Sequence, residues 1–271
     1  MLVAKKLLML AGAAAVLYGV LLGFLYLAQE RLMFAAATLP DDFRFDFDVP
    51  FEELSIPVDG ASLNALHFRQ QDPDGLVFFL HGNAGNLETW TSGIEYYQKV
   101  NYDLFIFDYR GYGKSTGNIG SETELHRDVR TAYDLIAQQY AGKPIVVYGR
   151  SLGAALATRL AVDVDAALVI LVSPFESMLR MASEQYPFVP TRLLRYPFRN
   201  DQHITNITAP IILVHGERDA LIPIEHSERL QTITNGRASL LRVEGAGHND
   251  IHLFPTYLDG LAAVLPHPRR D

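Results

Sequence analysis

The chain has 271 residues, of which 49% are hydrophobic and 20% charged, with a formal net charge of -8 and no cysteine. This composition fits one mid-sized folded domain with an appendage and excludes a disordered or fibrous protein. The acidic balance, without a Lys/Arg stripe to offset it, argues against nucleic-acid binding. The lack of cysteine excludes disulfides, a thiol nucleophile, iron–sulfur clusters and cysteine-ligated zinc.

An apolar run without a charged residue occupies residues 7–28. As a helix rising about 1.5 Å per residue it would reach about 33 Å, enough for a hydrocarbon core of about 30 Å. A cleaved signal peptide is the alternative, but its apolar region should be shorter and followed closely by a small-residue site. Here the only such site, 35–37, lies well beyond the run. We therefore expect an uncleaved transmembrane anchor over residues 1–30.

Two features of this segment concern topology and association. Lys5 and Lys6 precede the apolar run, so the positive-inside rule favours a cytoplasmic N-terminus with the remaining chain on the periplasmic or lumenal side, although Arg31 and Arg44 weaken the asymmetry. Small side chains also recur every four residues on one helix face. Such a face allows close helix–helix approach and predicts a homodimer, unless it only reflects the abundance of Ala and Gly in membrane helices. These residues are Ala11, Ala15, Gly19 and Gly23.

The segment after the anchor, residues 31–50, is interpreted as a connector. Phe alternates with charged residues over 43–48, a pattern that fits either a half-buried strand or aromatics at a membrane interface. Beyond it, residues 52–57 and 62–68 predict a hairpin around Asp59-Gly60.

The rest of the chain, within a domain over 51–271, alternates buried-strand and helical patterns. The clearest helical pattern covers 122–140. The alternation predicts an α/β fold with a mostly parallel eight-stranded sheet flanked by helices. It lapses once, over about 174–209, where prolines and aromatics predict a small lid rather than a plain surface excursion. The strand-like runs are 76–80, 103–107, 144–148, 166–172, 210–214 and 239–243.

The pentapeptide Gly-Arg-Ser-Leu-Gly at 149–153 matches G-x-S-x-G, which alone is a weak signal. Here it follows the strand 144–148 and begins the helical run 152–162. A strand, a sharp turn and a helix are the context that a nucleophile elbow requires. The turn would expose the Ser151 hydroxyl at the carboxyl end of the strand, near the positive end of the helix dipole. Ser151 is the predicted nucleophile.

A serine nucleophile needs a base and a group that orients this base. Asp219 follows the strand-like run 210–214 and His248 follows 239–243, which is the order Ser, Asp, His expected for this arrangement. The developing oxyanion needs preplaced N–H donors. We expect them from the backbone amides of Leu152 and Asn83.

Several neighbouring residues have competing interpretations. His248 and His252 lie four apart, as in half of a zinc site, but Asn249 stands where a metalloprotease needs Glu. Glu217 or Asp250 could replace Asp219 as the orienting carboxylate, which is a weaker hypothesis than Asp219 itself. The residues expected to have structural rather than catalytic roles are His81, Asp108 and Arg110.

Taken together, these motifs resemble the ABHD13/ABHD17-like, BEM46-type family of α/β-hydrolases over about residues 30–265. The resemblance implies an α/β-hydrolase fold with a Ser-Asp-His triad and no cofactor or metal. It says little about substrate, because the relatives include protein depalmitoylases and many members without an assigned substrate. The motifs are HGNAGN (81–86), DYRGYGKS (108–115), GRSLG (149–153), HGERD (215–219) and GAGHND (245–250).

The sequence therefore predicts a serine hydrolase that cleaves carboxylic ester or thioester bonds through an acyl-enzyme. A membrane anchor beside an aromatic lid favours acyl or lipid-like substrates. Two other enzyme activities, acyl transfer and peptide hydrolysis, could use the same triad. The alternative that is not an enzyme is a membrane-tethered scaffold with an inactive hydrolase fold.

Overall fold

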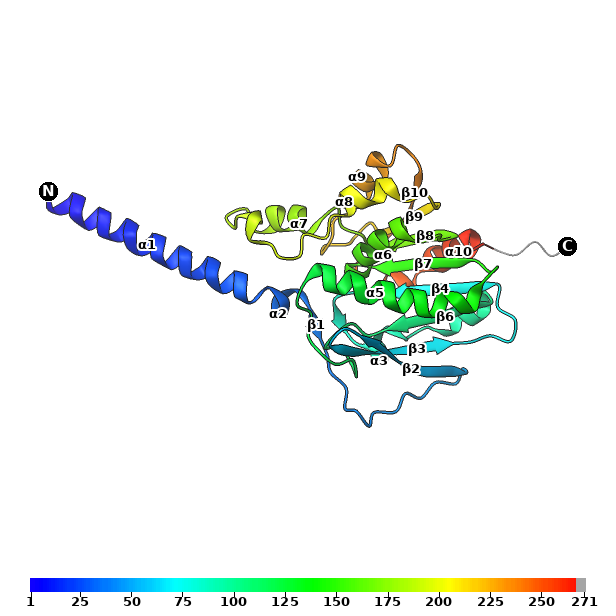
Figure 1. Cartoon of the computed structure of the whole chain (residues 1–271). Helices are drawn as coiled ribbons and strands as arrows, with labels where there is room; N and C mark the ends of the chain where they lie inside the picture. The colour runs from blue at the N-terminus through cyan, green and yellow to red at the C-terminus, as the bar shows by residue number, and fades with distance from the viewer. Residues whose placement is uncertain (267–271) are drawn as a thin grey trace.

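The computed structural model describes residues 1–266. A long helix, α1 (Leu2–Leu27), projects from an α/β body, as Figure 1 shows. No residue of α1 is buried, and the helix is long and apolar enough to cross a membrane by length and composition. Signal sequences pass the same test. The structure is thus compatible with the predicted anchor.

The face of α1 predicted for helix–helix contact is open in the single chain. A Cβ built on Gly19 or Gly23 would meet nothing within 4 Å. Two helices could therefore approach closely along this face, and the homodimer through Ala11, Ala15, Gly19 and Gly23 stays a prediction.

The body is built on one eight-stranded sheet with the order β10-β9-β8-β7-β4-β6-β3-β2. All pairings are parallel except those that β3 makes with β2 and β6. The predicted α/β fold and mostly parallel sheet are confirmed, including the hairpin turn at Asp59-Gly60. The strands are β2 (Phe51–Val58), β3 (Ala61–Phe68), β4 (Gly75–Leu80), β6 (Tyr102–Phe107), β7 (Ile145–Arg150), β8 (Leu168–Val172), β9 (Ile211–Gly216) and β10 (Ala238–Val243).

Helices cover both faces of this sheet, so the central strands are apolar on both sides. Phe78 of β4 packs with residues of α5, α6 and α9, whereas its neighbour Phe79 packs on the opposite face with residues of α10 and the α3–α4 segment. This burial explains the continuous apolar runs in the sequence. The helices are α3 (Leu87–Trp90), α4 (Glu95–Lys99), α5 (Glu122–Ala137), α6 (Leu152–Asp163), α9 (Glu225–Ile233) and α10 (Pro255–Val264).

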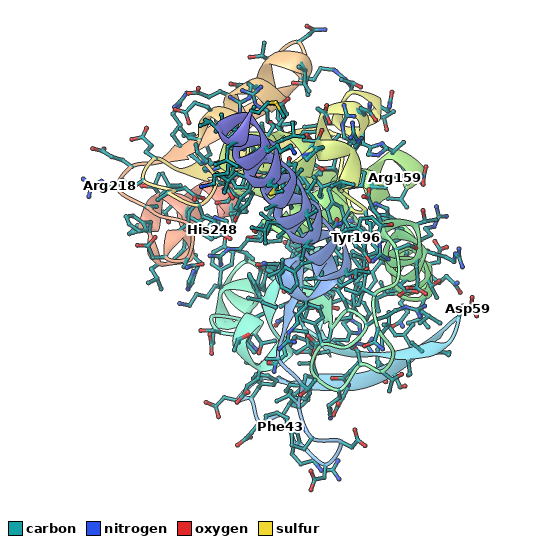
Figure 2. All side chains as sticks on the ribbon, turned by 90° about the vertical axis from the view of Figure 1, so that its left-hand side faces the viewer. Phe43, Asp59, Arg159, Tyr196, Arg218 and His248 are labelled. Carbon is teal, nitrogen blue, oxygen red and sulfur yellow. The ribbon has the colours of Figure 1, made fainter. Side chains whose placement is uncertain are left out.

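The segment predicted as a connector packs against the body. It forms α2 (Gln29–Met33) and β1 (Ala35–Ala36), and β1 pairs in parallel with β5 (Ala84–Gly85). Residues 43–48 form no strand. Phe47 instead packs edge-on against Phe51 and Phe68, each with ring centroids 5.1 Å apart. Figure 2 shows Phe43 at the lower end of the body.

The predicted lid region, about 174–209, divides into two parts. Tyr196 and Phe198 are fully buried in the core. Tyr186 and Phe188 are instead 53% and 57% exposed, and they follow α7, which lies on the side of the body that α1 leaves (Figure 1). Its elements are α7 (Met178–Gln185), α8 (Asn200–His203), η2 (Thr191–Leu193) and η3 (Ile204–Asn206); the other short helices are η1 (Gln138–Tyr140) and η4 (Ile251–Leu253).

Candidate active site

Ser151 lies in the turn between β7 and α6, with φ 54° and ψ -117°. Residues other than glycine rarely have a positive φ, so this conformation is strained. Glycines on both sides permit the turn to pack tightly. A Cβ on Gly149 would lie 2.3 Å from the carbonyl oxygen of Gly153. The turn has the strand–turn–helix geometry of the predicted nucleophile elbow.

The structure brings Ser151, His248 and Asp219 together in one hydrogen-bonded relay. Nε2 of His248 lies 3.1 Å from Oγ of Ser151, and Nδ1 of His248 lies 2.7 Å from Oδ2 of Asp219. Because a carboxylate only accepts hydrogen bonds, Nδ1–H is the donor to Asp219. Nε2 of the neutral ring is then free to accept the Ser151 hydroxyl proton. This is the geometry that general-base activation of a serine requires.

Asp219 is held as a carboxylate by its surroundings. Its Oδ1 accepts the amides of Leu221 at 3.0 Å and Ile222 at 2.8 Å. Burial alone would raise its pKa, but the nearby His215 ring and hydrogen bonds with His248 and the Ile222 amide outweigh burial and hold the pKa of Asp219 well below its usual range. Nε2 of His215 lies 3.4 Å from Oδ2 of Asp219. His215 was expected to have only local partners, and its ring nitrogens do lie 2.7 Å from Oγ of Ser227 and 2.8 Å from the Ile222 carbonyl oxygen; the start of the HGERD motif was the signal for its place beside Asp219.

The two residues with the predicted oxyanion donors line the cavity at Ser151. Leu152 is the first residue of α6, and Asn83 follows β4; both line the same cavity as Ser151. The Asn83 carbonyl accepts the Ala35 amide at 2.9 Å and the Tyr112 hydroxyl at 2.7 Å. These bonds fix the orientation of the Asn83 peptide. That its amide and that of Leu152 bind the oxyanion stays a prediction.

His252, Asp250, Glu217 and Arg110, for which other roles were considered, lie outside the relay. Nδ1 of His252 faces the guanidinium of Arg150 at 3.4 Å, an environment that repels a metal cation. Asp250 accepts the Gly247 amide at 2.7 Å, and Glu217 is exposed. Neither carboxylate contacts His248 in the described structure. Arg110 binds Asp128 of α5 through two hydrogen bonds, consistent with its expected structural role.

Arg150, which precedes the nucleophile, is a site residue that sequence reasoning missed. Its Nη2 donates to the carbonyl oxygens of His248 at 2.9 Å and Asn249 at 3.1 Å. Its guanidinium also lies over the ring of Trp90, 5.3 Å from the centroid. Arg150 thus connects the nucleophile turn to the loop that carries the base. No local pattern reveals this contact, because the partners are 98 residues apart.

We predict that Arg150→Met lowers kcat about 10²-fold, because a histidine displaced by about 1 Å no longer meets the Ser151 hydroxyl in line. KM should change little, since Arg150 is not among the described residues that line the cavity. Arg150→Lys keeps a cation but not the planar donor pair, so it should recover part of kcat. Steady-state kinetics and the Tm of each variant test this. A fall in Tm with no loss of kcat would contradict the positioning role.

A buried carboxyl–imidazole pair lies beneath the Asn83 loop. Nε2 of His81 is 3.6 Å from Oδ1 of Asp108, and both side chains are fully buried. Burial raises the pKa of Asp108 to about 8 and lowers the pKa of His81 to about 4. Burial therefore favours the uncharged form of both groups.

This pair predicts a pH dependence of stability. Between about pH 4 and 6.5 the two pKa shifts have opposite effects on the pH dependence of stability. Compared with the unfolded state, the folded state binds more protons at Asp108 and fewer at His81. From about pH 6.5 to 8 only the Asp108 shift remains, so stability falls by up to about 1.4 kcal/mol per pH unit. Asp108→Asn should remove this slope. Thermal unfolding of both proteins at pH 6.5 and pH 8 tests it, and parallel Tm changes would contradict it.

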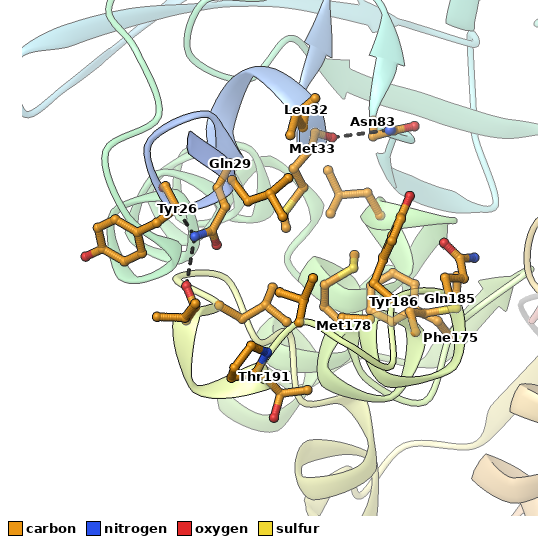
Figure 3. A pocket seen from close by; sticks show the side chains of 18 of the residues that line it. Tyr26, Gln29, Leu32, Met33, Asn83, Phe175, Met178, Gln185, Tyr186 and Thr191 are labelled. Carbon is orange, nitrogen blue, oxygen red and sulfur yellow. Dashed lines mark hydrogen bonds between the residues drawn. The ribbon is translucent and has the colours of Figure 1, made fainter. Parts of the chain in front are cut away.

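Ser151 opens into a cavity of about 590 Å³ with mostly apolar walls. Figure 3 shows Leu32 and Met33 of α2 on one side, and Met178 and Tyr186 of the α7 region on the other. Its volume is within the range of about 300–1,000 Å³ that is usual for ligand sites. The arrangement joins a polar relay to an apolar binding space.

Comparison with known sequences finds similarity to α/β-hydrolase proteins. The family described as serine aminopeptidase, S33, matches residues 71–200. Alpha/beta hydrolase domain-containing protein 17B of Xenopus laevis is 35% identical over 190 residues, which is 68% of this chain and 64% of that protein. The human protein 17C is 34% identical over 194 residues, 70% of this chain and 58% of that protein. The chain thus matches less than two thirds of the length of these relatives.

Comparison with solved structures shows the same fold. An esterase from Pyrococcus furiosus aligns with a TM-score of 0.67 and 19% identity, over 85% of this chain and 95% of that chain. An alpha-beta hydrolase from Vibrio vulnificus aligns with a TM-score of 0.67 and 20% identity, over 79% and 81%.

The order of the sheet and the similarity to the solved structures give this chain the α/β-hydrolase fold. The relatives 17B and 17C confirm the ABHD17-like resemblance of its motifs.

Proposed function

We propose that this protein is a serine hydrolase that cleaves ester or thioester bonds of apolar acyl substrates through an acyl-enzyme. It would act at a membrane in which α1 anchors the chain. One observation carries the proposal: the relay of Ser151, His248 and Asp219 opens into an apolar cavity. A nucleophile, its base and its orienting carboxylate are the parts that acyl transfer needs.

In the first step Oγ of Ser151 attacks the substrate carbonyl carbon while Nε2 of His248 takes the hydroxyl proton. Asp219 stabilises the resulting imidazolium through Nδ1–H, and its lowered pKa keeps it ionised throughout. The oxyanion forms beside the amides of Asn83 and Leu152. One such donor is worth about 3–4 kcal/mol of transition-state stabilisation.

The tetrahedral intermediate then collapses. The bond to the alcohol or thiol breaks, and His248 returns its proton to this leaving group, which leaves the acyl group on Ser151. Water enters, gives a proton to Nε2 of His248 and attacks the acyl-enzyme carbonyl. Collapse of the second intermediate releases the carboxylic acid and returns the proton to Ser151.

The cavity supports an apolar acyl group as the substrate. Each buried methylene contributes about 0.8 kcal/mol, so a long chain would gain much of its binding free energy here. Met178, Met181 and Leu194 are among the lining residues, and methionines adapt to flexible apolar chains.

The position of α1 supports action at a membrane. The Tyr18 hydroxyl donates to the carbonyl oxygen of Phe188 at 2.5 Å, so the exposed part of the lid region lies against the anchor. Tyr186 and Phe188 are both more than half exposed, and aromatic side chains are enriched at membrane interfaces. The catalytic domain would then face the periplasmic or lumenal side, as Lys5 and Lys6 indicate; protease protection of sealed vesicles tests this orientation.

The decisive experiment treats the full chain in detergent with a fluorophosphonate probe and locates the adduct by peptide mass spectrometry. We expect the adduct on Ser151, together with turnover of p-nitrophenyl esters and acyl thioesters. An unlabelled Ser151, with no turnover, would favour the inactive scaffold. Product analysis with added alcohol or amine acceptors separates hydrolysis from acyl transfer.

A further inference from the structure

The end of the anchor forms one wall of the cavity at Ser151. Six residues from the last part of α1 through α2 line this cavity, opposite the residues of the lid region. The segment therefore lies within the binding site as well as next to the membrane. These residues are Phe24, Leu25, Tyr26, Gln29, Leu32 and Met33.

Polar contacts fix this wall against the lid region. Gln29 donates from Nε2 to the carbonyl oxygen of Leu193 at 2.8 Å, and its Oε1 accepts the Arg195 amide at 2.8 Å. Glu30 accepts the Tyr196 hydroxyl at 2.9 Å and forms an ion pair with Arg195. Two consecutive residues thus tie the anchor to the lid region, and thermal rotation of α1 about its axis would have to break these bonds.

The same wall is bonded to the loop that carries Asn83. The Asn83 side chain donates to the Met33 carbonyl oxygen at 3.2 Å, and the Ala35 amide donates to the Asn83 carbonyl oxygen at 2.9 Å. The anchor end, the lid region and the candidate oxyanion loop therefore form one connected frame around the cavity.

We propose that the six lining residues between Phe24 and Met33 form the acyl-binding wall and determine the length of acyl chain that the enzyme accepts. The inference rests on the proposed ester hydrolysis at Ser151 and assigns to the anchor a second role, in substrate specificity. An apolar wall excludes chains too long for the cavity by steric overlap and favours shorter ones. Leu25 is the best probe, because it is half-buried and lines the cavity.

The test compares kcat/KM for p-nitrophenyl acetate, butyrate, laurate and palmitate in the full chain and its variants, all in the same detergent. Leu25→Trp fills part of the cavity, so the ratio of kcat/KM for palmitate to kcat/KM for acetate should fall about tenfold or more. Leu25→Ala enlarges the cavity and should move the preference the other way, towards palmitate. Opposite shifts are not expected from a general disturbance of the fold.

Leu27→Trp is the matched control, since Leu27 lies two residues along the same helix, is 78% exposed and is not among the described lining residues. It should keep the chain-length profile of the unaltered protein. Equal profiles for Leu25→Trp and Leu27→Trp, with acetate turnover intact, would overturn this inference and leave the proposed function standing. An unaltered protein that turns over none of the esters would overturn the proposed function, and this inference with it.

Discussion

His248→Ala is expected to lower kcat for ester hydrolysis about 10⁶-fold, close to the loss from removing the nucleophile itself. Nε2 of His248 lies 3.1 Å from Oγ of Ser151 and accepts the hydroxyl proton. Removal of the imidazole takes this acceptor away. The residual rate would come from binding and from the oxyanion donors. Steady-state kinetics with an activated ester measure the loss.

Non-additivity sharpens this prediction. The double variant Ser151→Ala with His248→Ala should be no slower than Ser151→Ala alone, because the residues act as one unit. Asp219→Asn should cost about 10⁴-fold, since an asparagine can favour the wrong tautomer of the ring. A His248→Ala protein that kept more than about one hundredth of kcat would contradict the assigned base.

Gly153→Ala should prevent stable folding, although alanine normally stabilises a helix relative to glycine. A Cβ at this position would lie 2.0 Å from the carbonyl oxygen of Leu80 and 2.5 Å from that of His81. These are backbone atoms of β4 and its loop, which cannot move away without breaking the sheet. We expect a loss of at least about 4 kcal/mol of stability, measured as a large drop in Tm or loss of folded protein.

Gly12→Ala provides the control for this prediction. Gly12 is also a helical glycine, in α1, and a Cβ there would meet nothing within 4 Å. Its Tm should stay unchanged or rise slightly. A Gly153→Ala protein with the Tm of the unaltered chain would show that α6 can move away from β4, and the tight turn at Ser151 would then need another explanation.

Much of the fold was predictable because its signals are local. A strand buried on both faces must be apolar along its whole length, as in β4, β7 and β9, and the run of such segments defines the sheet. The carboxyl ends of parallel strands meet at one edge. Residues directly after these strands, such as Ser151, Asp219 and His248, could therefore be placed together before any distance was known.

The connector and the lid region were harder to predict, because burial there depends on distant partners. Phe alternates with charged residues over 43–48 as in a strand, yet these residues form none, and Phe47 packs on Phe51 and Phe68. Tyr196 and Phe198 fall within the predicted lid, about 174–209, but they are core residues. Alternating or aromatic residues indicate that their side chains are buried, but they do not indicate the surface against which these side chains pack.

The sequence by itself determined the α/β class and the apolar helix at the N-terminus. It also determined that the candidate relay residues follow three predicted strands in the order Ser151, Asp219, His248. These follow from hydrophobic periodicity and from short motifs whose geometry is local. Only the tertiary structure decided that Arg150 holds the His248 loop, that His215 lies beside Asp219, and that Leu25 and Met33 line the cavity at Ser151. Such contacts join residues far apart in the chain, where packing rather than local pattern selects the partner.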